Sequence, residues 1–144
     1  MPQRIQAVEL MDRSYKILKQ QVFESGNYKI VPIRHEDRHL IRQWRNEQIY
    51  HLRQDKPLSE EDQDRYFDTV VASLFEQEQP DQMLFSYLKG DHCIGYGGLV
   101  HINWRDRHAE ISFVMKTSED KYFELHWIQI LGLIETVAFK ELDL

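Results

Sequence analysis

Two side chains near the middle of the chain, His101 and Glu110, are placed to do acid–base chemistry. They lie in residues 94–115, which read IGYGGLVHINWRDRHAEISFVM and predict two strands joined by a polar turn. A carboxylate in an otherwise apolar strand needs a partner or a chemical use. With a two-residue turn at Arg105-Asp106, His101 lies opposite Glu110, and the pair could relay a proton. A one-residue register slip separates the two onto opposite faces, and Glu110 could instead simply form an ion pair at the rim of the sheet.

Three glycines in the first of these strands mark a second feature of the hairpin. Gly95, Gly97 and Gly98 indicate a bulge or a place where another group approaches the backbone closely. Tyr96 lies between them and faces away from Gly95 and Gly97, because side chains alternate along a strand. Tyr96 therefore contacts a substrate or fills the space that the glycines leave.

Other reactive side chains fit no catalytic or metal-binding pattern. Ser112 and Cys93 lie in no recognisable nucleophile motif. His35 and His39 have i, i+4 spacing, but no acidic residue completes a metalloprotease-like pattern. We therefore expect both histidines to be surface residues and not metal ligands. We therefore expect no metal.

Composition limits the class of protein. A net charge of −6 counts against a nucleic-acid partner that is bound by bulk electrostatics. With one cysteine no intrachain disulfide can form, which fits a cytoplasmic location. The longest apolar stretch, residues 127–139, contains Gln129 and Glu135 and is too short to span a bilayer, so we expect no membrane partner.

Hydrophobic periodicity and turn signals predict an α+β fold of mixed layers, in which helices cover a mostly antiparallel sheet in one domain, residues 1–144. Ile5, Val8 and Met11 suggest a short first helix. Strands are expected at 15–23, 28–34, 83–89, 94–103 and 109–116. Helices are expected at 36–48, after the N-cap residue Ser59 and along the apolar stripe from Phe123 to Ala138. Tyr66, Phe67 and Phe75 are expected in the core, and the alternative is that they line a substrate pocket.

Several short motifs follow one another along the chain in a fixed order. They are Pro32-Ile33-Arg34, Trp44-Arg45-Asn46, Tyr66-Phe67, Ile94-Gly95-Tyr96-Gly97-Gly98 and Ala109-Glu110-Ile111-Ser112-Phe113. Over residues 28–144 this order resembles the GNAT superfamily of acetyl-CoA-dependent N-acetyltransferases, and most of all the branch of ribosomal-protein and amino-sugar acetyltransferases. Residues 1–27 are then an N-terminal extension.

The resemblance implies acetyl-CoA as co-substrate and direct acetyl transfer to a primary amine of a small amine, an amino sugar or a peptide N-terminus. Glu110 is then the base, with His101 beside it. The pantetheine arm pairs with the backbone of Phe113, Val114 and Met115, while Lys116, Lys121 and Tyr122 lie near the phosphates. Arg45, Asn46 and Tyr96 shape the acceptor pocket, although Trp44 is expected in the core and Arg45 could instead make a structural ion pair.

Two departures from the family pattern bear on activity. The loop at 116–124 has no glycine and carries Glu119, Asp120 and Glu124, which repel phosphate. The chain also ends where relatives continue, so we expect it to lack C-terminal elements and to form a homodimer or swapped assembly through its last helix. Ile128, Leu133, Phe139 and Leu142 fall outside the main stripe of that helix.

These departures leave two alternatives open. One is a catalytically weak or inactive acetyltransferase-like domain that binds a ligand or a partner. The other is an unrelated α+β binding domain, which a sheet without a splayed strand pair at 97–98 and 113–115 would favour.

Overall fold

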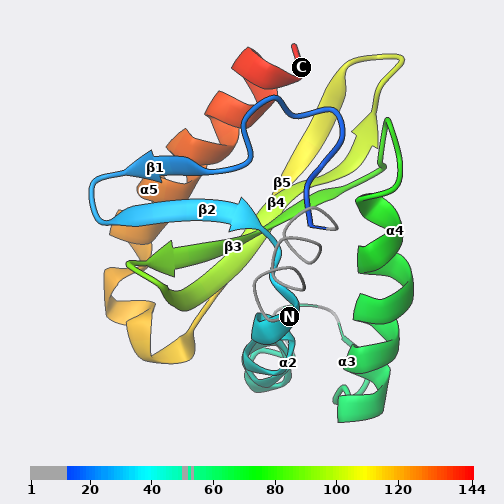
Figure 1. Cartoon of the computed structure of the whole chain (residues 1–144). Coiled ribbons are helices and arrows are strands. Elements are labelled where there is room, and N and C mark those ends of the chain that lie inside the picture. The colour runs from blue at the N-terminus through cyan, green and yellow to red at the C-terminus, as the bar shows by residue number, and fades with distance from the viewer. Residues whose placement is uncertain (1–12, 50–51, 53) are drawn as a thin grey trace, which may run out of the picture.

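The computed structural model describes residues 13–49, 52 and 54–144, so the helix expected near residues 5–11 lies outside the described part. Its centre is a five-stranded sheet in which each strand pairs antiparallel with the next in sequence (Figure 1). The strands are β1 (Phe23–Ser25), β2 (Tyr28–Pro32), β3 (Met83–Lys89), β4 (His92–Asn103) and β5 (His108–Met115). The predicted α+β class is confirmed.

Helices lie on both faces of the sheet. They are η1 (His35–Asp37), α2 (Arg38–Glu47), α3 (Glu60–Tyr66), the π-helical η2 (Phe67–Val71), α4 (Ala72–Leu74), η3 (Thr117–Tyr122), α5 (Phe123–Thr136) and the π-helical η4 (Val137–Glu141). Tyr87 of β3 pairs with Gly95 and contacts His126 of α5. Tyr96 follows Gly95 and therefore faces the opposite side, where it contacts Arg45 of α2.

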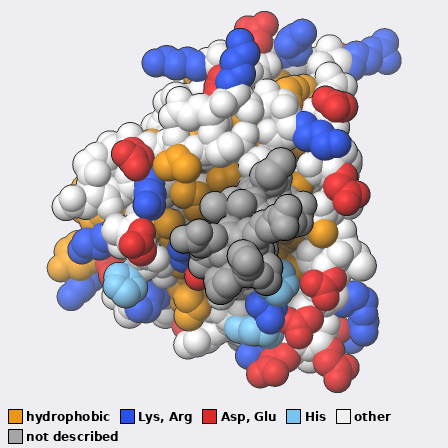
Figure 2. All heavy atoms as spheres, in the orientation of Figure 1, with side chains coloured by type: hydrophobic (Ala, Val, Ile, Leu, Met, Phe, Trp, Pro, Cys, Tyr) orange, Lys and Arg blue, Asp and Glu red, His pale blue; other side chains and the backbone are white. Residues whose placement is uncertain are grey.

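Local sequence signals account for several element boundaries. Ser59 and Asp62 form a capping box at the start of α3, where three acidic residues complement the helix dipole. Figure 2 shows acidic side chains gathered over this helix. Gly26 and Gly90, both at φ +61°, form the turns between β1 and β2 and between β3 and β4. Pro32 is the last residue of β2, as expected for a residue that cannot donate to the ladder.

The strand predicted at residues 15–23 is wrong, since only Phe23 lies in a strand. Side chains take the place of ladder bonds there. Gln21 accepts a hydrogen bond from the amide of Tyr15 and donates to the carbonyls of Tyr15 and Leu18. The Tyr15 hydroxyl in turn donates to the carbonyl of Leu84 and accepts from its amide, at 2.6 and 2.7 Å. One buried tyrosine thus attaches an irregular segment to β3.

The core prediction for the second helical segment is correct for Phe67 and Phe75 and wrong for Tyr66, which is 38% exposed. Tyr66 is the last residue of α3, where its ring contacts Phe67 and its hydroxyl accepts from Gln82 at 3.3 Å. Trp44 is buried, as expected.

The last helix buries a broader face than its main stripe. Ile130, Ile134 and Val137 are fully buried, as expected, and Leu133 and Leu142 are also buried, although they lie outside the main stripe. The π-helical turn of η4 helps to bring Leu142 inward, since its amide bonds to the carbonyl of Val137, five residues earlier. By contrast, Phe123, Ile128 and Phe139 are exposed.

Candidate functional site

The β4–β5 hairpin differs from its predicted register. Four residues, 104–107, form the turn in place of two, and Asn103 closes it by accepting a hydrogen bond from the amide of Asp106 at 2.9 Å. Val100, and not His101, lies opposite Glu110, and the ladder is irregular between Val100 and Asn103. The predicted pairing of His101 opposite Glu110 is therefore wrong.

A backbone irregularity nevertheless brings the two side chains together. His101 has a φ of +50°, which interrupts the alternation of side chains along β4. His101 Nε2 lies 3.9 Å from Glu110 Oε2, and the two side chains are 78% and 72% exposed. The pair therefore stands at the rim of the sheet in contact with solvent.

The strand glycines are explained by neighbouring backbone. A Cβ at Gly97 would overlap the carbonyl of Ser112, and one at Gly98 would overlap the carbonyl of Met83. Gly98 also has a φ of +153°, which L side chains rarely adopt. The prediction of a close approach at these glycines is confirmed, and the approaching groups are the flanking strands.

The outer edge of β5 has no strand partner in the described part of the chain. The expected splay at 97–98 and 113–115 does not occur, because β4 and β5 pair without interruption from Gly95–Met115 to Val100–Glu110. The Lys116 amide donates to the Ile94 carbonyl, so by antiparallel alternation the main-chain groups of Phe113 and Met115 face outward and those of Val114 face β4. The edge thus offers amide groups to an extended ligand.

The end of α2 is attached to the end of this edge. Gln48 Nε2 donates to the Met115 carbonyl at 2.8 Å, and the Thr117 hydroxyl donates to Glu47 Oε2. The bonds from Thr117 and Gln43 lower the pKa of the Glu47 carboxyl. Together these contacts hold the start of the 116–124 loop against the face of the sheet that carries α2.

The loop itself is a 3₁₀ turn that leads into α5. Lys116, Lys121 and Tyr122 are exposed on it, with Lys121 Nζ 5.1 Å from the centre of the Tyr122 ring. His126, which sequence reasoning passed over, lies buried behind the loop. Its Nδ1 is 3.0 Å from the Tyr87 hydroxyl, and its Nε2 is 3.4 Å from Glu119 Oε2. The sequence signal for this buried histidine was its position as a polar residue within the apolar stripe of the last helix.

A cavity of about 320 Å³ lies between α2, α3 and β4. Its lining residues are Ile33, Ile41, Arg45, Gln54, Leu58, Asp62, Gln63, Tyr66, Phe67 and Tyr96. We call it the Arg45 pocket. Arg45 Nη1 donates to the hydroxyl of buried Tyr96 at 2.6 Å. Burial raises the pKa of the Tyr96 phenol, and the Arg45 charge and hydrogen bond only partly oppose this effect.

Asn46 lies behind the wall of the Arg45 pocket. Its side chain accepts from the amide of Leu58 at 2.8 Å and donates to the carbonyl of Leu58 at 3.0 Å. It therefore fixes residue 58 in the wall and is not itself part of the lining. The structure brings together two of the three predicted acceptor residues, Arg45 and Tyr96, and gives Asn46 a positioning contact.

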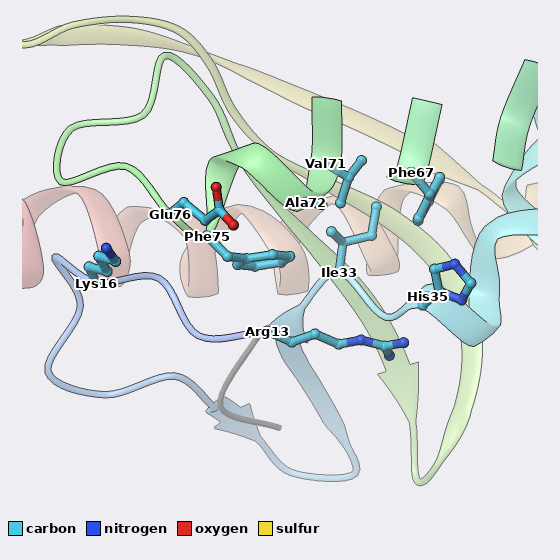
Figure 3. A pocket seen from close by; sticks show the side chains of 9 residues that line it. All are labelled: Arg13, Lys16, Ile33, His35, Phe67, Val71, Ala72, Phe75 and Glu76. Carbon is cyan, nitrogen blue, oxygen red and sulfur yellow. The ribbon is translucent and has the colours of Figure 1, made fainter. Parts of the chain in front are cut away.

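Figure 3 shows a second hollow, with a volume of about 410 Å³. Apolar side chains of η2 and α4 meet Ile33 there, and Arg13, Lys16, His35 and Glu76 also line it. Ile33 and Phe67 line both hollows. Nothing in the sequence predicted this second hollow.

Reactive groups elsewhere are few in the described ranges. Cys93 is buried, and burial raises the pKa of its thiol to about 12, which disfavours the nucleophilic thiolate. Among residues 13–49, 52 and 54–144 no three His, Cys, Asp or Glu side chains come together as metal ligands. None of the described helices has the length and apolar character needed to cross a membrane.

In a comparison with protein families, residues 30–144 match the acetyltransferase (GNAT) domain. The chain belongs to this family. No curated protein matches it. Acetyltransferases of the GNAT family generally use acetyl-CoA, so the family supports acyl transfer in the broad sense. The uninterrupted β4–β5 pairing therefore does not mark an unrelated fold.

Some described residues of this GNAT domain favour the binding of acetyl-CoA, and others oppose it. The outward amide and carbonyl of Phe113 and the outward amide of Met115 match the amides of a pantetheine arm, which can add to a sheet edge as a strand does, whereas the Met115 carbonyl is already bonded to Gln48. At the start of α5, Glu119, Asp120 and Glu124 oppose phosphate, while Lys116 and Lys121 attract it. The edge fits the arm of the co-substrate better than the loop fits its phosphates.

Proposed function

We propose that the chain is an acetyl-CoA-dependent N-acetyltransferase that transfers the acetyl group directly to a primary amine. The observation that carries this proposal is the open edge of β5, where the amide and carbonyl of Phe113 and the amide of Met115 face outward. The edge leads directly into the 116–124 loop and α5. Its opposite side pairs with β4, which carries Tyr96 of the Arg45 pocket.

Chemistry at this edge needs a neutral amine, whereas an alkylammonium group has a pKa of about 10. Glu110, supported by His101, accepts the proton through water. The amine nitrogen then attacks the thioester carbonyl, the C–N bond forms, the C–S bond breaks, and the thiolate takes up a proton. An outward amide of β5 can donate to the oxyanion that develops. We assign Lys116, Lys121 and Tyr122 to the phosphate end of the co-substrate.

Finer features of this proposal follow the family resemblance. The acceptor is a small amine, an amino sugar or a peptide N-terminus, as in the ribosomal-protein and amino-sugar branch. A cytoplasmic location fits the single, free cysteine. We further propose that the protein associates with a second copy through α5 and η4, because Leu125, Ile128 and Phe139 are each more than half exposed there.

Calorimetric titration with acetyl-CoA tests the proposal at the β5 edge. Phe113→Pro removes the outward N–H of residue 113, and Phe113→Ala is the matched control, since it also loses the ring but keeps the N–H. We expect Phe113→Pro to weaken acetyl-CoA binding about tenfold relative to Phe113→Ala, as for one lost hydrogen bond in a dry site. Circular dichroism establishes that both variants are folded.

Two results would count against the proposal. Equal affinities for the two folded variants would remove the backbone edge from the binding site. If the unmodified chain does not bind acetyl-CoA, the result would favour the alternative, an acetyltransferase-like domain that binds a partner.

A further inference from the structure

Four half-buried arginines lie in or just before α2, and three of them have a carboxylate partner. Arg34 bonds to Asp37 and Arg38 to Asp64, each at 2.7 Å. Arg42 lies 3.7 Å from Glu60. Arg45 is different, because its hydrogen-bond partner is the phenol of Tyr96 and no carboxylate of the described residues lies within ion-pair distance.

Inside the cavity the charge of Arg45 is therefore met by one phenol and by no carboxylate of the described residues. One acidic residue, Asp62, does line the Arg45 pocket, but its oxygens face Ser59 and Arg65 in the capping box and its ion pair. A charge that is partly removed from water is costly unless an opposite charge or hydrogen bonds compensate for it. The position of Arg45 is that of a cation whose counter-charge comes from a ligand.

A second polar group in the same pocket also lacks a partner. Gln54 Nε2 donates to Asn46 Oδ1 at 3.1 Å and to the Lys56 carbonyl at 2.9 Å. Both partners are acceptors, which fixes the orientation of the amide. Gln54 Oε1 is buried and has no hydrogen-bond partner in the described part of the chain. The pocket thus offers one cation and one unpaired acceptor.

We propose that the Arg45 pocket binds an amine acceptor that carries its own carboxylate. The carboxylate lies on the Arg45 guanidinium and accepts from the Tyr96 phenol, while a hydrogen-bond donor of the acceptor meets Gln54 Oε1. One guanidinium and one phenol match a monoanion, whereas a phosphate dianion would need more donors. A volume of about 320 Å³ is at the small end for ligand sites. The ligand is therefore a small molecule.

The register of β4 and β5 gives the distance that the acceptor must span between its carboxylate and its amine. Tyr96 pairs with Val114, and Glu110 lies four residues away on the same face of β5, or about 13 Å along the strand. An acceptor that is held at Arg45 and reaches toward Glu110 needs several bonds between carboxylate and amine. This spacing favours an ω-amino carboxylate over an α-amino acid, a conclusion that rests on the proposed transferase function.

Binding of hexanoate, which has no amine, tests the pocket independently of catalysis. We expect hexanoate to bind by calorimetry, and we expect Arg45→Gln to weaken its binding about tenfold or more, because a charge-assisted hydrogen bond is lost. Arg42→Gln is the matched control, since it removes the same charge from the same helix one turn away. Tyr96→Phe, which keeps the ring, serves as a second variant should Arg45→Gln fold poorly, and it should weaken hexanoate binding less.

Acetyl transfer to 6-aminohexanoate, hexylamine and glycine then tests the acceptor class. A preference for 6-aminohexanoate over hexylamine that Arg45→Gln abolishes and Arg42→Gln leaves intact supports the proposal. It is overturned if hexanoate does not bind, if both variants weaken binding equally, or if hexylamine or glycine is the better acceptor. Arg45-dependent binding of hexanoate without any acetyl transfer would support the carboxylate site and count against the transferase function.

Discussion

Two polar pairs along β4 differ in their surroundings although each has one member on that strand. Tyr96 meets Arg45 at 2.6 Å inside a cavity, whereas His101 and Glu110 stand 3.9 Å apart with most of their surface in water. Solvent screens the second pair, so it contributes little to folding. The first pair includes the buried phenol of Tyr96, so its contribution depends on the residues that surround it. We therefore expect changes at the Arg45–Tyr96 pair to alter stability and binding, and changes at the His101–Glu110 pair to alter chemistry alone.

The largest effect should come from Gly98, which lies on β4 between the two pairs. Gly98→Ala places a Cβ against the Met83 carbonyl at a φ of +153°, so we expect a loss of about 3–5 kcal/mol in the free energy of unfolding. The Arg45–Tyr96 pair and the His101–Glu110 pair should be disrupted together. Urea denaturation measures the change.

Gly132→Ala is the matched control for Gly98→Ala. Gly132 lies in α5 with open space around its Cβ position, and alanine is the better helix former, so stability should rise by up to about 1 kcal/mol. A Gly98→Ala protein as stable as the unmodified chain would mean that β3 and β4 can separate at this point.

Glu110→Gln should affect turnover and leave folding unchanged. We expect kcat for the proposed transfer to fall about 10²-fold or more, because general-base catalysis is lost, and the free energy of unfolding to change by less than about 0.5 kcal/mol. Steady-state kinetics with 6-aminohexanoate and a parallel urea titration measure both quantities. Unchanged kcat would reduce Glu110 to a rim ion pair, which is the other interpretation of its sequence position.

Asn46→Ala should show the opposite pattern, with stability affected first. Leu58 would lose partners for both its amide and its carbonyl, and Gln54 would lose one acceptor, so we expect a cost of about 1–3 kcal/mol. Gln43→Ala, which removes an exposed i, i+4 contact with Glu47, should cost less than about 0.5 kcal/mol. If the two variants are equally stable, the wall of the Arg45 pocket does not depend on Asn46.

Periodicity and turn chemistry were enough to predict most of the sheet. Residues 83–89 form β3 as expected, and β4 and β5 agree with their predicted ranges to within two residues. Residues 15–22 were predicted wrongly because their alternation resembles a strand, while the groups that satisfy their backbone are the side chain of Gln21 and the distant Leu84. Tertiary contacts of this kind leave no local pattern.

Candidate site residues were predictable by type but not by arrangement. Tyr96 and Arg45 are fifty-one positions apart, and only the packed α2 on β4 joins them. His101 and Glu110 come together through a bulge and a four-residue turn that the assumed hairpin geometry excluded. Gln54 belongs to no sequence motif. It matters because the fold buries its Oε1 without a hydrogen-bond partner in the described part of the chain, which no local pattern predicts.

The smallest expected effect concerns the protonation of Tyr96 and sharpens the contrast with the exposed pair. Burial raises the pKa of the Tyr96 phenol above its ordinary value of about 10, so this phenol should remain neutral while accessible tyrosines ionise. Tyr96→Phe should therefore leave the rise in absorbance at 295 nm near pH 10 unchanged in the folded protein and lower it by one tyrosine in guanidinium chloride. Because the folded pKa is the higher one, the associated stability is present below about pH 10 and declines as pH rises further. A smaller rise for the folded variant near pH 10 would show that the Tyr96 phenol ionises with the accessible tyrosines and that burial does not raise its pKa.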